Sequence, residues 1–188
     1  MMKSRKPNSL HIRLYGDKTL REVAKPVTEF TEEINNFIDD LVFTMYQKDG
    51  VGLAAPQVGR SLRIFVVDPL WFNDEGKKNP LVLVNPEFIE FHGEIEKDEG
   101  CLSLPNIFEP VKRAQMVIIE GLNEKGKKVR YEAEGLFARA LQHEFDHLDG
   151  IMFIDKVTKL KRVFLKKKLH DLQGTTDENG RNIGEITL

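Results

Sequence analysis

The stretch LQHEFDHLDG, residues 141–150, has the residue types and the spacing of a catalytic metal site. His143 and His147 lie four residues apart, and Glu144 directly follows the first histidine. On an α-helix, residues four apart share one face with Cβ atoms about 5–6 Å apart, so both imidazoles can bind one ion. Glu144 then lies within reach of a water bound to that ion. The competing interpretation is two unrelated histidines, but the chain has five in all, so we favour a metal-dependent hydrolase.

A catalytic site of this kind uses three protein ligands and keeps one position open. Peptidases with this pattern supply the third ligand downstream, yet Phe153 stands where the extended motif needs histidine. The downstream glutamates Glu178 and Glu185 lie in a polar tail. Upstream, DEGCLSLP (98–105) contains Cys101, the single cysteine. A lone cysteine is more often a small buried apolar residue, but the incomplete helix favours Cys101 as the third ligand.

Hydrophobic periodicity predicts the elements that position these residues. Helical spacing indicates helices over 31–46, 136–148 and 158–172, while short apolar runs indicate strands over 63–67, 81–85, 116–121 and 128–133. A glycine-rich loop is expected over 50–59, a turn around Gly126, and a helix stop at Gly150. The polar tail from Gly174 is either disordered or one short strand. This order of elements predicts an α+β fold.

Composition places the chain among ordinary globular proteins. Its 188 residues suit a single compact domain, and its formal charge of -2 gives no overall field for nucleic acid or for an acidic substrate. One cysteine excludes an intramolecular disulfide framework and fits a reducing compartment. We find no apolar run that would span a bilayer and no signal-peptide core. We therefore expect a cytoplasmic protein without membrane contact.

Three segments resemble the motifs of the peptide deformylase family, in the same order and with similar spacing: GVGLAAPQVG (50–59), EGCLSLP (99–105) and QHEFDHLDG (142–150). The likeness extends from about Leu20 to Asp155. It implies one domain over 1–188, with antiparallel sheets packed around a central helix that carries the HExxH motif. Within it we expect a catalytic core over about 20–155, the basic helix over 158–172 and the tail over 174–188. The implied activity removes the formyl group from the N-terminal formylmethionine of new polypeptides. The usual metal is Fe²⁺, with Zn²⁺, Ni²⁺ or Co²⁺ as alternatives.

The resemblance also implies a role for individual residues. Glu144 would be the general acid and base, while Gln57 and the backbone N–H of Leu102 would face the oxyanion. Taken alone, Gln57 could equally be a loop amide that binds nearby carbonyls. The metal ligands would be Cys101, His143 and His147, and the substrate groove would be lined by Val51, Gly52, Glu99 and Gly100. Two positions depart from some family members: Phe108 replaces an arginine, and Arg139 replaces an apolar pocket residue.

The 158–172 segment is strongly basic and leaves its role open. Such charge runs are most often solvated faces, but docking to ribosomal RNA, where formylated chains emerge, is the sharper alternative. The basic residues are Lys159, Lys161, Arg162, Lys166, Lys167 and Lys168. Two other classes also remain open beside a monomeric deformylase: a metallopeptidase, and an RNA-binding or structural zinc module. The missing downstream ligand disfavours the peptidase, and an open coordination position disfavours the structural module.

Overall fold

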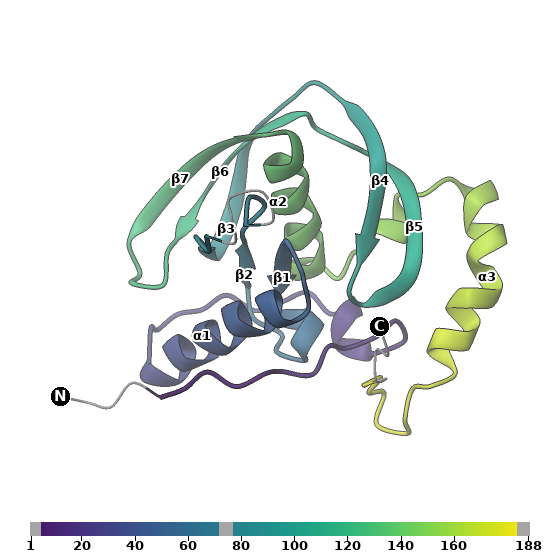
Figure 1. Ribbon diagram of the computed structural model, residues 1–188, viewed down its shortest axis with the longest axis horizontal. Helices are drawn as coiled ribbons and strands as arrows, with labels where there is room; N and C mark the ends of the chain where they lie inside the picture. Colours follow the sequence, from purple (N-terminus) through teal and green to yellow (C-terminus); the bar gives the residue numbers. More distant parts are fainter. Residues whose placement is uncertain (1–4, 72–76, 184–188) are drawn as a thin grey trace.

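The fold, seen in a computed structural model that describes residues 5–71 and 77–183, is built around a strand buried on both faces. This strand is β2 (Ile64–Val67), and all four of its residues are buried. Because side chains alternate along a strand, Ile64 and Val66 pack with helix α1 (Glu32–Gln47), while Phe65 and Val67 pack with helix α2 (Gly135–Leu148). The two helices therefore cover opposite faces of the sheet (Figure 1).

Five antiparallel strands form the main sheet, in the order β1-β2-β3-β6-β7. Strand β1 (Gly52–Ala54) is one edge and β7 (Lys128–Glu134) is the other. Between β2 and β7 lie β3 (Leu81–His92) and β6 (Met116–Leu122). The register of β3 against β6 shifts beside Asn85, whose amide side chain bonds to both the N–H and the carbonyl of Val27.

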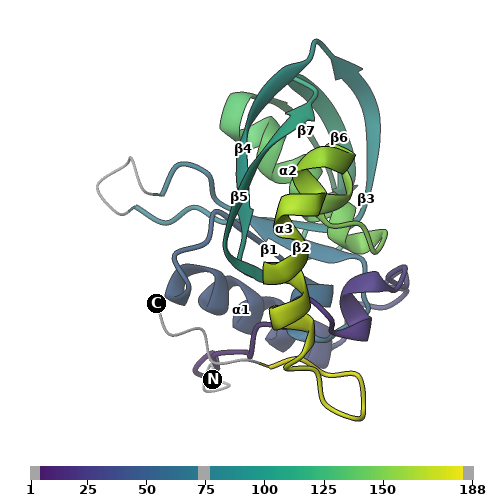
Figure 2. The same cartoon turned by 90° about the vertical axis from the view of Figure 1, so that its right-hand side faces the viewer.

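A second sheet is a long hairpin of β4 (Ile95–Cys101) and β5 (Leu104–Arg113). Leu104, Ile107 and Val111 of β5 are buried in a cluster that also contains Leu165 and Leu169 of helix α3 (Lys159–Gln173). Helix α3 therefore packs along the hairpin, as Figure 2 shows. Three short 3-10 helices complete the described elements: η1 (Lys18–Arg21), η2 (Ala55–Val58) and η3 (Phe153–Asp155).

Local signals explain where the two main helices begin and end. The Thr31 side chain accepts a hydrogen bond from the N–H of Ile34 and caps α1, and Glu32 and Glu33 occupy its first turn, where the helix dipole favours negative charge. Helix α2 ends at Leu148, and Gly150 follows with a φ of 70° that glycine adopts without strain.

The predicted α+β class, the three helices and the turn at Gly126 are confirmed. The extent of the strands is partly wrong. Part of the predicted loop 50–59 is the edge strand β1, and the predicted strand 81–85 continues to His92. The β4–β5 hairpin was not predicted at all, because β4 has three consecutive charged and exposed residues (96–98) and so lacks the alternation that marks a half-buried strand.

The polar tail forms turns and no strand over its described part, residues 174–183. Asn182 is fully buried, its N–H donates to Asp17, and its carbonyl accepts from the N–H of Leu14. Residues 184–188 lie outside the described residues. The expected division into core, basic helix and tail stays a prediction. Within the described parts of the chain, no helix is both long enough and apolar enough to cross a bilayer.

Phe153 occupies the position where an extended peptidase motif would need histidine, and it is a core residue. It is 1% exposed, and its ring stacks on His143 with centroids 6.1 Å apart. We expect Phe153→Ala to lower the free energy of unfolding by about 3–5 kcal/mol, because a large buried ring is lost and leaves a cavity. The measurement is urea denaturation, with Phe164→Ala as the control, since Phe164 is 77% exposed. Equal effects of the two changes would contradict this.

Candidate active site

Helix α2 carries three of the candidate catalytic residues into the interior. His147 and Glu144 are 1% and 3% exposed, and His143 is also buried. The two imidazole rings lie with centroids 5.0 Å apart and planes nearly perpendicular. This arrangement follows from the four-residue spacing on one helix face, so the pairing predicted from the sequence is present.

Cys101 reaches the same point from another element. It ends β4, just after a register shift in the hairpin at Glu99, and its sulfur lies 3.4 Å from Nε2 of His147. Potential ligand atoms of Cys101, His143 and His147 all lie within 4.8 Å of one another. One sulfur and two imidazole nitrogens are a donor set that suits a tetrahedral transition-metal site with a fourth position open.

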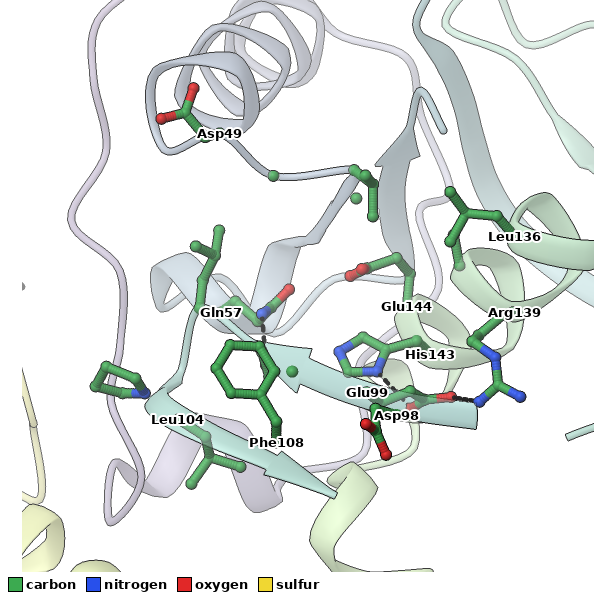
Figure 3. Close-up of a pocket in the computed structure, with 18 of the residues that line it drawn as sticks. Asp49, Gln57, Asp98, Glu99, Leu104, Phe108, Leu136, Arg139, His143 and Glu144 are labelled. Atoms are coloured by element: carbon green, nitrogen blue, oxygen red, sulfur yellow. Dashed lines mark hydrogen bonds and ion pairs between the residues drawn. The ribbon is translucent and has the colours of Figure 1, made fainter. Parts of the chain in front are cut away.

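The carboxylate of Glu99 holds this cluster in place from behind. It accepts hydrogen bonds from Arg113 at 2.8 and 2.9 Å and from Arg139 at 2.6 Å, and it lies 3.1 Å from Nδ1 of His143. Figure 3 shows the contacts with His143 and Arg139. Occupying Nδ1 leaves Nε2 as the ring nitrogen for an ion, an orientation common among metal-binding histidines. Burial opposes the charge on Glu99, but Arg113 and His143 hold its pKa well below the usual range.

Burial, hydrogen bonds and neighbouring charges shift the pKa values of the two histidines in opposite directions. Burial alone would lower the pKa of His143, but hydrogen bonds to Cys101 and Glu99 raise it well above its usual value. The pKa of His147 is well below its usual value, because of burial and the neighbouring His143.

Glu144 lies beside this cluster with an unusual environment for a carboxylate. Its Oε2 is buried and has no hydrogen-bond partner among the described residues. Burial raises the pKa of Glu144 to about 7. A carboxylate with a pKa near neutrality can both take up and release a proton in one reaction cycle.

Gln57, on η2, has contacts that fit both roles left open by the sequence, a loop amide and a donor that faces the reaction site. Its Oε1 accepts a bond from the N–H of Ala54 at 2.8 Å, which ties the loop backbone. Its Nε2 lies 3.3 Å from the sulfur of Cys101 and 3.4 Å from the hydroxyl of Ser103. The loop bond therefore fixes the amide so that its N–H donors face the cluster.

A pocket of about 560 Å³ opens in front of these residues (Figure 3). Edge strand β1 and the turn before it form one wall, and the end of the hairpin forms another. The four residues predicted for the groove, Val51, Gly52, Glu99 and Gly100, all line it. The lining also includes other predicted site residues: Leu102, Gln57, Cys101, His143 and Glu144. His147 lies behind, among the candidate ligands. Three segments distant in sequence therefore meet at one site.

Comparison with known proteins agrees with this geometry. A model of the polypeptide deformylase family matches residues 9–163. The peptide deformylase of Halothermothrix orenii is 54% identical over 151 residues, which cover 80% of this chain and 95% of that protein. The chain belongs to the polypeptide deformylase family.

Other members of the family give the same result. The peptide deformylase of Thermodesulfovibrio yellowstonii is 46% identical over 159 residues, covering 85% of this chain and 95% of that protein. The crystal structure of a peptide deformylase from Legionella pneumophila is 43% identical, with a TM-score of 0.81 over 89% of this chain and 96% of that chain. Family membership favours the deformylase over the peptidase and the structural zinc module.

The two departures from the family pattern lie on the pocket wall and at its mouth. The guanidinium of Arg139 bonds to Glu99 and to the carbonyls of Ile95 and Val111. It is therefore held by the hairpin. Phe108 is 68% exposed, and its ring lies so close to Gly100 that a Cβ there would come within 2.7 Å of it.

Sequence reasoning missed Arg113 and Asp146. Arg113 is 5% exposed and bridges Glu99 and Asp146, and the Asp146 bond measures 2.5 Å. No signal in the sequence marked Arg113, because it ends a strand that was not predicted and follows a lysine, as many exposed arginines do. Asp146 gave a weak signal: it lies three residues after His143, on neighbouring turns of the helix.

Gly52 provides a direct test of how closely this backbone approaches Glu144. A Cβ at Gly52 would overlap the carboxylate and lie 2.8 Å from Cδ of Glu144. We expect Gly52→Ala to lower kcat about 100-fold, because displacing a catalytic group by roughly 1 Å has that effect. Metal content should stay unchanged, since no candidate ligand moves.

The control is Gly174→Ala at the end of α3, where a Cβ would meet its nearest atoms at an ordinary 3.4 Å. Formate release and metal content are measured for both variants. A Gly52→Ala enzyme with the kcat of the wild type would show that Glu144 does not need this space.

Proposed function

We propose that this chain is a metal-dependent peptide deformylase that hydrolyses the formyl amide of N-formylmethionyl peptides and releases formate. The observation that carries the proposal is the convergence of Cys101, His143 and His147 with Glu144 at the inner end of a pocket. The chain's membership of the family supports the same reaction.

The substrate would bind as an added strand along β1. This strand is an edge of the main sheet, and an extended peptide can pair with such an edge whatever its side chains are. Sequence-tolerant pairing suits an enzyme that meets many different N-termini. The methionine side chain would enter the apolar part of the pocket, which includes Leu102, Leu136 and Ala140.

The residues of the chain then divide the chemistry. A divalent ion held by Cys101, His143 and His147 would supply Lewis acidity and lower the pKa of a water for attack on the formyl carbon. Glu144 takes the proton of the attacking water and passes it to the leaving amine nitrogen. The amide N–H of Gln57 and the backbone N–H of Leu102 donate to the formyl oxygen as it becomes negative. Each such donor contributes about 10²–10³ in rate.

The identity of the metal is part of the proposal. A thiolate is a soft ligand that accepts several first-row ions together with imidazole. We propose Fe²⁺ as the native ion, with Zn²⁺, Ni²⁺ or Co²⁺ able to occupy the same ligands. The thiolate also makes the iron form sensitive to oxidation.

Two substitutions separate holding the ion from proton transfer. Glu144→Gln keeps the size of the side chain but removes the base, so we expect kcat to fall about 10²–10⁴-fold with metal content unchanged. Cys101→Ala removes one of three candidate ligands, so we expect the ion to bind more weakly or to be lost, and activity to fall with it. Metal analysis after anaerobic purification, with formate release from a formyl-Met dipeptide, measures both.

The outcomes that would contradict this are distinct. Full metal content in Cys101→Ala would show that the sulfur of Cys101 is not a ligand. Cleavage of the peptide bond in place of formate release would identify a peptidase. Zinc as the ion in anaerobic wild type would overturn the assignment of iron.

We also propose that the chain acts as a cytoplasmic monomer that contacts the ribosome through α3. The outer side of α3 exposes lysines, together with Leu160, Val163 and Phe164. Lys161 is paired with Glu109 at 3.7 Å, which leaves the 166–168 lysines as the more available charges. A basic helix of this kind suits a phosphate backbone.

The monomeric state has its own test. A molar mass of twice that of one chain, measured by light scattering, would contradict the monomer.

Charge reversal tests the ribosome contact. Changing Lys166, Lys167 and Lys168 to glutamate should abolish co-sedimentation with ribosomes at low salt, because the phosphate contacts are replaced by repulsion. Peptide deformylation should stay unchanged, since α3 does not line the pocket. The matched control reverses Lys125, Lys127 and Lys128 at the β6–β7 turn. Binding that survives the α3 change, or is lost equally in the control, would rule out docking by α3.

A further inference from the structure

Two glycines flank Val51 in the segment that faces the substrate. Gly50, Val51 and Gly52 all line the pocket. Glycine at 52 allows the backbone to approach Glu144, since a Cβ there would overlap the carboxylate. Glycine also has more conformational freedom to lose on folding than any other residue, so the side chains of this segment restrain its backbone little. The segment therefore needs anchors outside itself to present fixed donors and acceptors.

Two hydrogen bonds from the stretch after β2 supply those anchors. The indole Nε1–H of Trp71 donates to the carbonyl of Gly50 at 3.0 Å. The backbone N–H of Asp68 donates to the carbonyl of Val51 at 2.9 Å. The peptide units on both sides of Val51 are thus held by their carbonyl ends.

Holding the carbonyls also aims the N–H groups. A trans peptide unit is planar, with its C=O and N–H pointing in opposite directions. The bond from Asp68 draws the Val51 carbonyl toward β2, so the N–H of Gly52 points toward the open edge of the sheet. The bond from Trp71 likewise sets the direction of the Val51 N–H. These are backbone donors that an extended peptide would meet.

The anchors are themselves fixed to helix α1. Asp68 is 3% exposed, and its Oδ2 accepts from the hydroxyl of Tyr46 at 2.5 Å and from the N–H of Asn79 at 2.7 Å. The rings of Tyr46 and Trp71 meet edge to face, with centroids 5.4 Å apart. Tyr46 lies in the last turn of α1, immediately before the turn that leads into Gly50.

We propose that Tyr46, Asp68 and Trp71 form a clamp that positions residues 50–52 for pairing with the peptide backbone of the substrate. The clamp residues are outside the pocket lining and act through the backbone of Gly50 and Val51, so they are positioning residues. The inference rests on the proposed deformylase function. It assigns to this part of the chain control over the affinity for peptides that extend beyond methionine.

Trp71→Phe tests the clamp, because it removes the indole donor and keeps an aromatic ring against Tyr46. For a formyl-Met tripeptide we expect KM to rise about 3–10-fold, the effect of losing one hydrogen bond, with kcat within two-fold. For N-formylmethionine, which has no following residues to pair, kcat/KM should change less than two-fold. Tyr46→Phe, which loses the hydrogen bond to Asp68, should also raise the KM for the tripeptide. This second variant tests the clamp even if Trp71→Phe does not fold.

The control is Tyr131→Phe on β7, whose ring contacts Phe137 and lies away from the pocket. This substitution should leave KM and kcat unchanged for both substrates. A tripeptide KM that is unchanged in both clamp variants, or an equal loss for both substrates, overturns the clamp. Wild-type enzyme is assayed first: if it releases no formate from either substrate, the proposed function fails and the clamp fails with it. If the wild-type enzyme releases formate and both clamp variants keep its tripeptide KM, the clamp is overturned and the proposed function stands.

Discussion

The Glu99 carboxylate is the interaction on which the rest of the site depends. The candidate ligands come from two separate elements, the sulfur from the end of the β4–β5 hairpin and the imidazoles from α2, and Glu99 joins them. It is bonded to Arg113 of β5 and Arg139 of α2, and Arg113 continues to Asp146 of α2. Burying these charges is costly and contributes little net stability unless every group is paired. Here the pairing fixes the position of the hairpin against the helix, which a purely apolar contact would leave free to slide.

The main sheet supplies the other constraint, because β2 is buried on both faces. Its two faces pack against α1 and α2, and its neighbour β1 carries backbone that lines the pocket. Helix α2, which carries two of the candidate ligands, and the edge strand β1 are thus both held by β2. Glu144 lies where α2 and β1 meet, against Gly52, so a shift of either element would displace its carboxylate.

The sequence predicted the parts of this arrangement that depend on local pattern. The HExxH helix, helix 31–46 and the strand at 63–67 follow from periodicity that their buried faces require. Cys101 was found by elimination, since the helix lacked a third ligand. The hairpin that delivers Cys101 was missed, because long-range burial against α3 and the Glu99 pairs, not alternation, stabilise it. Arg113 was missed for the same reason: a buried arginine looks like an exposed one until its partners are known.

Arg139 shows why residue type alone misjudges the pocket. A charged residue at a position where some members of the family have an apolar one suggests a polar pocket. The guanidinium, however, is bonded to Glu99 and to hairpin carbonyls, and the residue as a whole is 7% exposed. What such a side chain offers its surroundings is chiefly its hydrocarbon stem, since a long cationic residue commonly covers apolar surface with its methylenes. The charge therefore belongs to the scaffold that fixes Glu99, and the wall beside Leu136 and Ala140 stays suited to a methionine side chain.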